Sequence, residues 1–86
     1  MNDKLMRMLN SIGKKCFVDY YYDFKSNSSF DTLPIEYTDK SKKSRQSHSN
    51  WIFNNNLEFS ALEICSRANI DQVTKNKAIK IISSEK

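Results

Sequence analysis

The side chains in this sequence that are best suited to chemistry are cations and hydroxyls, and they gather just after residue 38. In order, this stretch holds Lys40, Ser41, Lys42, Lys43, Ser44, Arg45 and Gln46. Lysine and arginine bind phosphate oxygens, while serine and glutamine hydrogen-bond to phosphates or to base edges. The sequence therefore predicts that these seven residues contact double-stranded DNA.

The positive charge is local to this stretch. Residues 38–56 carry four Lys or Arg side chains and one acidic side chain, whereas residues 26–37 carry two acidic side chains and no basic ones. The formal net charge of +4 favours polyanionic partners, but a charge of this size is also common in small soluble domains. A helix whose lysines are merely solvated would show the same pattern.

Groups that could carry catalysis are few. The chain has one histidine, His48, and two cysteines, Cys16 and Cys65, and their spacing predicts no pairing of nucleophile and base. Tyr20–Tyr22 would need several cations around a phosphate to act as nucleophiles, and the three arginines fall on different predicted helices. We expect no enzymatic activity and no cofactor. We also expect no metal site, since a structural zinc ion requires four ligands.

The basic stretch is predicted to open a helix over residues 39–55. Thr38 or Asp39 can cap its first turn, and the three asparagines at 54–56 can end it, because asparagine tolerates a left-handed backbone. Trp51–Phe53 place large apolar surface near its end. We expect that end to anchor the helix in the core, with Trp51 as the main anchor and with the N-terminal half facing a ligand.

Residues 3–25 show the spacing of an amphipathic helix. Its apolar stripe consists of Leu5, Leu9, Ile12, Cys16, Tyr20 and Phe24, widened by Phe17 and Tyr21. A strand over residues 16–24 is the alternative, but a helix separates Asp19 and Asp23 from the stripe and a strand does not. We expect Gly13 to bend or interrupt this helix, Tyr22 to lie on the polar side and both thiols to be buried and free.

Residues 26–29 are expected to form a loop, followed by one or two helical turns within 30–37. With the 39–55 helix, these turns would make an element similar to a helix-turn-helix over residues 30–53, in which the second helix reads DNA. Pro34 fits this plan poorly, because proline disfavours helix interiors.

The apolar spacing in the C-terminal third predicts two further helices. Leu57, Ala61, Leu62 and Cys65 lie on one face of the first, which Asn69 can stop. Asp71 can cap the second. In this second helix, Val73, Ala78, Ile81 and Ile82 are expected to point inward and Lys75, Lys77 and Lys80 outward. Residues 83–86 are expected to fray.

The sequence thus predicts one domain, residues 1–86, with an all-α fold: a compact bundle of four to five short helices. It shows no apolar run long enough for a membrane span and no secretory signal, so a cytoplasmic protein is expected. The predicted function is that of a small basic DNA-binding protein with an accessory or regulatory role. The alternative is a helical adaptor that binds a protein partner. A homodimer is compatible with both, because it would enlarge a small core.

Overall fold

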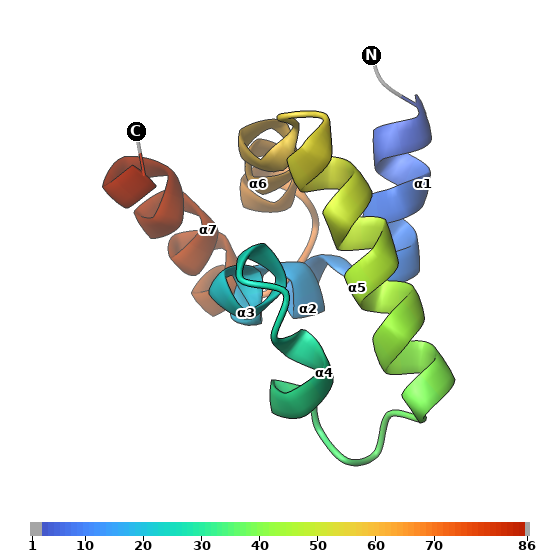
Figure 1. The fold of residues 1–86 in the computed structure, drawn as a ribbon. Coiled ribbons are helices and arrows are strands. Elements are labelled where there is room, and N and C mark those ends of the chain that lie inside the picture. The colour runs from blue at the N-terminus through green and yellow to red at the C-terminus, as the bar shows by residue number, and fades with distance from the viewer. Residues whose placement is uncertain (1–2, 86) are drawn as a thin grey trace.

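A computed structural model of the protein describes residues 3–85, and within them every regular element is an α-helix (Figure 1). The helices are α1 (Asp3–Ile12), α2 (Lys14–Asp19), α3 (Tyr21–Lys25), α4 (Ser29–Thr32), α5 (Asp39–Asn54), α6 (Glu58–Arg67) and α7 (Gln72–Glu85). The all-α class is confirmed. The predicted number of four to five helices is too low, because the N-terminal third divides into more pieces than expected.

The predicted helix over residues 3–25 is broken twice. Gly13 adopts a φ of 96°, a conformation that side-chain-bearing residues rarely take, and it separates α1 from α2. Tyr20 separates α2 from α3. Hydrogen bonding starts again at each break, because Phe17 N donates to Gly13 O (2.9 Å) and Phe24 N donates to Tyr20 O (2.9 Å). Residues 16–24 are therefore helical on both sides of Tyr20, and the strand alternative is wrong.

Helix α4 is a single turn that starts at Ser29, and the predicted turns over 30–37 are confirmed only up to Thr32. Leu33 takes an extended backbone with ψ 147°, as expected for a residue before proline, and its side chain is buried. Residues 33–38 then form a loop. It includes a turn that is closed by a hydrogen bond from Tyr37 N to Pro34 O (3.1 Å). This loop is the lowest part of the molecule in Figure 1.

Helix α5 begins and ends where the sequence predicts. Thr38 accepts a hydrogen bond from the Ser41 amide at 3.0 Å, which is an N-cap. At the other end, Asn56 takes the left-handed conformation, with φ 56°. Ile52 is fully buried, but Trp51 is only half-buried and packs on the edge of the core, with Lys4 Nζ 5.0 Å from its ring centre. Ile52, rather than Trp51, is the main anchor of this helix.

Helices α6 and α7 pack on each other, as do α1 and α5 (Figure 1). Val73, predicted to point inward, is exposed, whereas Ala78 and Ile81 are buried as expected. Residues 83–85 continue α7 instead of fraying, and Glu85 pairs with Lys25 of α3 at 2.6 Å. Lys86 lies outside the described residues.

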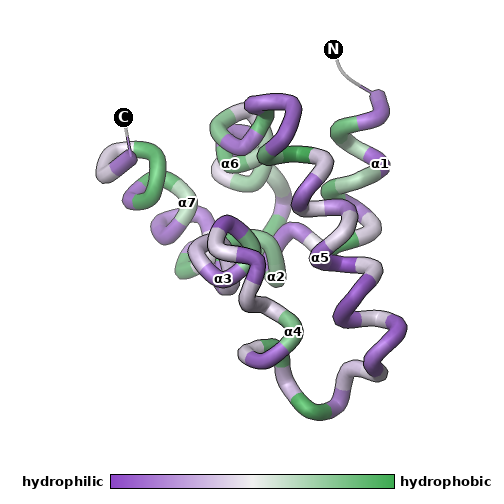
Figure 2. Tube along the Cα trace, in the orientation of Figure 1, coloured by the Kyte–Doolittle hydropathy of each residue, from purple (hydrophilic) through white to green (hydrophobic). Residues whose placement is uncertain are grey.

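The core centres on aromatic side chains of α2 and α3. Phe17 meets Tyr21 edge-on at 5.7 Å between ring centres, stacks on Phe24 at 6.2 Å, and contacts Phe53 of α5 at 6.1 Å. Leu5, Leu9 and Ile12 of α1 also belong to this core, together with buried residues of α5, α6 and α7. Tyr22 is exposed, as predicted for the polar side of the helix. The hydropathy-coloured trace shows most of α5 in purple, whereas green alternates with purple along α1 (Figure 2).

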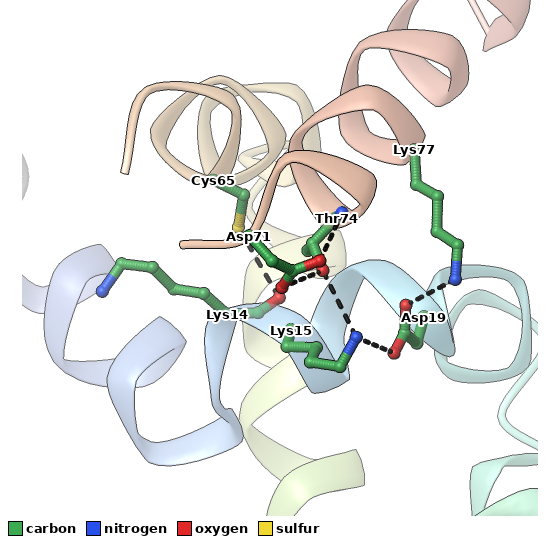
Figure 3. Close-up of polar contacts among 7 residues, drawn as sticks. All are labelled: Lys14, Lys15, Asp19, Cys65, Asp71, Thr74 and Lys77. Atoms are coloured by element: carbon green, nitrogen blue, oxygen red, sulfur yellow. Dashed lines mark hydrogen bonds and ion pairs between the residues drawn. The ribbon is translucent and has the colours of Figure 1, made fainter. Parts of the chain in front are cut away.

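A polar network attaches α7 to α2 (Figure 3). Lys15 Nζ lies 3.4 Å from Thr74 Oγ1 and 3.4 Å from Asp19, and Lys77 reaches the same Asp19 carboxylate at 3.0 Å. Lys15 and Asp19 are four residues apart, the spacing at which opposite charges meet on one helix face. Asp71 accepts bonds from the Thr74 amide (3.0 Å) and hydroxyl (2.8 Å), which confirms it as the cap of α7.

The Asp71 cap makes stability depend on pH. The bonds from Thr74 lower the pKa of the Asp71 carboxyl below its ordinary value of 3.8, so the native state favours its ionised form. The stability gained from this shift is present above the ordinary pKa and is lost as the pH falls through the lowered one. In thermal denaturation, Asp71→Ala is therefore expected to have a lower Tm than wild type at pH 7. The difference should shrink in strong acid, and an equal difference at both pH values would contradict this role.

No helix in the described part of the chain is both long enough and apolar enough to cross a membrane.

Candidate nucleic-acid interface

Three lysines surround the first two turns of α5. Lys40 and Lys43 are exposed, and Lys42 is half-buried. Lys15, Lys25 and Lys77 each pair with a carboxylate, whereas none of the three α5 lysines does so within residues 3–85. We call these three residues the α5 lysine cluster. Their charges add to the partial positive charge of the helix N-terminus, which also attracts anions.

Phe30 of α4 lies beside the α5 lysine cluster. The ammonium groups of Lys42 and Lys43 lie 5.5 Å and 5.9 Å from the centre of its ring, within cation–π range. Phe30 nonetheless keeps 37% of its surface exposed, and Ile35 in the following loop keeps 92%. The corner formed by α4, the loop and the start of α5 therefore combines positive charge with exposed apolar surface.

This corner also carries negative charge. Asp31, Glu36 and Asp39 are all exposed. Asp39 occupies the first turn of α5, where a carboxylate stabilises the helix. A phosphate therefore has to approach from the side of the lysines.

Arg45 points into the fold. Its guanidinium donates to the Ile12 carbonyl at the end of α1, stacks over the Tyr37 ring at 4.5 Å, and donates through Nε to Ser41 Oγ at 3.2 Å. A Cβ at Gly13 would lie only 3.5 Å from the same guanidinium. The prediction that Arg45 and Ser41 are free to face DNA does not fit this arrangement, because Arg45 fastens α5 to the break between α1 and α2.

Gln46 is also turned inward, and the prediction that it faces DNA is wrong. Only 8% of its surface is exposed. Its Oε1 accepts a hydrogen bond from Ser29 of α4, and its Nε2 donates to Phe24 O at 3.0 Å and to Asn50 Oδ1 at 2.7 Å. Buried polar groups require such partners, and Gln46 thereby ties α3, α4 and α5 together.

The remaining predicted residue, Ser44, is exposed and lies 3.4 Å from His48 Nδ1. The structure therefore brings Lys40, Lys42, Lys43 and Ser44 together on the surface and assigns Arg45, Gln46 and Ser41 to internal contacts. Sequence reasoning did not identify Phe30 and Ile35 as exposed apolar residues of this corner, and it placed Ile35 in a helical turn. The available signal was Pro34, which ends α4 and moves Ile35 into a loop.

The internal role of Arg45 predicts a large effect on stability. Arg45→Ala should lower the free energy of unfolding by about 2 kcal/mol, because it removes a charged hydrogen bond and leaves a carbonyl without its partner. The melting temperature should fall by roughly 8 to 16 °C for a domain of this size. Lys43→Ala, an exposed neighbour without an ion pair, is the control and should change the free energy by less than about 0.5 kcal/mol. Equal stability of both variants would show that Arg45 does not fasten α5.

The other candidate groups do not converge. Both cysteines are free; Cys65 is buried as predicted, whereas Cys16 is half-buried. Burial raises the pKa of the Cys65 thiol to about 12, and it also raises the pKa of Cys16 despite the nearby Arg45. Within residues 3–85, no hydrogen bond joins His48 to either thiol. No group of three His, Cys, Asp or Glu side chains there could hold a metal ion.

A groove of about 680 Å³ lies between α1 and α6. Its apolar lining comes from Leu5, Met6, Leu57 and Ile64, and Lys14, Glu63 and Arg67 add charged groups. It does not include any residue of the α5 lysine cluster, so the groove and the cluster are separate surfaces on which a partner could bind.

Comparison of the chain with protein-family models, curated proteins and solved structures finds no significant match.

Proposed function

We propose that this protein binds double-stranded DNA through the N-terminal half of α5. The observation that carries the proposal is the α5 lysine cluster: three ammonium groups at the start of the longest helix, none paired with a carboxylate within residues 3–85. Lysines that already neutralise a carboxylate offer less charge to phosphate than unpaired ones do. The cluster therefore supplies the electrostatic contacts on which DNA affinity largely depends.

The spacing of the cluster suits a phosphate backbone. Lys40 and Lys43 are three residues apart and lie on one helix face, and Lys42 and Lys43 both reach the ring of Phe30. Ser44 adds an exposed hydroxyl that can donate to a phosphate oxygen. Thr38 caps the helix, so the side chains around its first turns are held on an ordered backbone.

The surroundings of α5 support a helix-turn-helix-like element in which α4 and its loop precede the DNA-contacting helix. The supporting helix is only one turn long, and the bond from Ser29 to Gln46 fixes it to α5. Arg45 and Gln46, the side chains best suited to base edges, are held inside the fold. We infer that binding depends on phosphate contacts and discriminates weakly between sequences, as an accessory protein requires.

The experiment that tests the proposal is a titration of a labelled 20-base-pair duplex at two salt concentrations. Binding should be detectable at 50 mM salt and should weaken steeply by 200 mM, because each phosphate contact contributes roughly 0.9 to the slope of log K against log salt. Two unrelated duplex sequences should bind with similar affinity. No binding at 50 mM, or binding that does not respond to salt, would contradict the proposal.

The groove between α1 and α6 favours a second candidate, an adaptor that binds a protein partner. Its largely apolar lining resembles the grooves that accept amphipathic helices. Ile64→Lys would place a charge in this groove. Ile79→Lys is the matched control, because Ile79 lies half-exposed on α7, away from the groove. A partner retained by wild type and by Ile79→Lys, but lost by Ile64→Lys, would support the adaptor. A partner lost equally by both variants would argue against the adaptor. Sedimentation of the same proteins would show whether that partner is a second copy.

A further inference from the structure

The exposed ring of Phe30 lies within the positive field of the α5 lysine cluster. Large aromatic side chains are usually buried, but this one keeps 37% of its surface in solvent while two ammonium groups lie within 6 Å of its centre. Ile35, 92% exposed in the adjoining loop, adds apolar surface to the same corner. An aromatic platform beside cations that can follow a phosphate backbone is the combination by which proteins hold unpaired bases.

We propose that this corner binds single-stranded nucleic acid, with one unpaired base stacked on Phe30 and its neighbouring phosphates on Lys42 and Lys43. The inference rests on the proposed function, because it uses the same lysines, and it adds the class of nucleic acid that binds best. In an intact duplex the faces of the bases are stacked on one another, so a surface ring has no base to stack on. Single strands and overhangs present those faces.

The local structure can hold such a platform in place. Phe30 lies on α4, and the buried bond from the neighbouring Ser29 to Gln46 attaches that turn to α5. The ring and the lysines therefore lie on two segments that are fixed to each other. Asp31 and Glu36 are exposed nearby, so the phosphates of the strand must lie toward the lysines and away from these two carboxylates.

The test compares a labelled 15-mer of deoxythymidine with a 15-base-pair blunt duplex at one salt concentration. The variants are Phe30→Leu, Phe30→Tyr and the triple variant Lys40→Ala/Lys42→Ala/Lys43→Ala. Phe30→Leu removes the aromatic face but keeps an apolar side chain, and it should weaken binding of the single strand by about 5- to 150-fold. Its affinity for the duplex should change less than about twofold. Phe30→Tyr keeps the ring and should bind the single strand as wild type does.

The outcomes separate the two proposals. If wild type binds the duplex and Phe30→Leu leaves the single-strand affinity unchanged, the stacking inference is overturned and the phosphate contacts stand. Equal weakening of both nucleic acids by Phe30→Leu also overturns it, since the effect is then not specific to unpaired bases. If wild type binds neither nucleic acid, the proposed function fails together with the inference. Circular dichroism of each variant checks that its total helix content matches that of wild type.

Discussion

Phe17→Ala is expected to destabilise the fold by about 3 to 5 kcal/mol, the usual loss for a large buried aromatic. Phe17 is fully buried and lies within about 6 Å of the rings of Tyr21, Phe24 and Phe53, so its removal leaves a void that three elements share. A domain of this size has a total stability of roughly 5 to 15 kcal/mol, so much of the variant could be unfolded at 37 °C.

Thermal denaturation followed by circular dichroism measures this effect. Ile35→Ala removes a side chain that is 92% exposed, and it should leave the melting temperature close to that of wild type. If Phe17→Ala melted within a few degrees of Ile35→Ala, the aromatic cluster would not be the centre of the core.

The second large effect concerns DNA. The slope of log K against log salt is negative, and replacing Lys40, Lys42 and Lys43 with alanine should make it less steep by up to about 2.7, since three phosphate contacts at roughly 0.9 each are removed. If the two proteins bind equally at 1 M salt, this corresponds to a loss of about two to three orders of magnitude in affinity at 0.1 M. Stability should change little, because these lysines form no ion pair with the described carboxylates.

The matched control removes the same charge elsewhere. Lys14, Lys75 and Lys80 also have no carboxylate partner within residues 3–85, whereas Lys77 is unsuitable because it pairs with Asp19. Alanine at these three positions should change the slope of log K against log salt far less than alanine in the α5 lysine cluster does. Equal losses from both triple variants would mean that total charge, rather than the start of α5, drives binding.

The ends of the longer helices could be predicted from sequence because they depend on local chemistry. Thr38 and Asp71 bond to amides three residues ahead, and Asn56 adopts a backbone that few other residues tolerate. The break at Tyr20, where the backbone takes φ −114° and ψ 25°, has no comparable local signal. Val73 shows the same limit: it is an apolar residue on an amphipathic helix, yet 62% of its surface is exposed.

The candidate interface could be predicted only in part, for a related reason. The excess of lysine is visible in the sequence, and Lys40 and Lys43 are exposed as expected. The inward turn of Arg45 and Gln46 depends on partners that are distant in sequence: the Ile12 carbonyl for Arg45, and Ser29 and the Phe24 carbonyl for Gln46. Periodicity along one helix cannot identify such partners.

The central claim is that DNA meets this protein at the start of α5, and amide chemical shifts followed during a titration with a 20-base-pair duplex test it residue by residue. The account predicts that the largest changes fall on residues 38–44 and grow as the salt concentration is lowered. Amides of α6 and of the second half of α7 should change little. Changes concentrated along the groove between α1 and α6, or an unchanged spectrum at 50 mM salt, would contradict it.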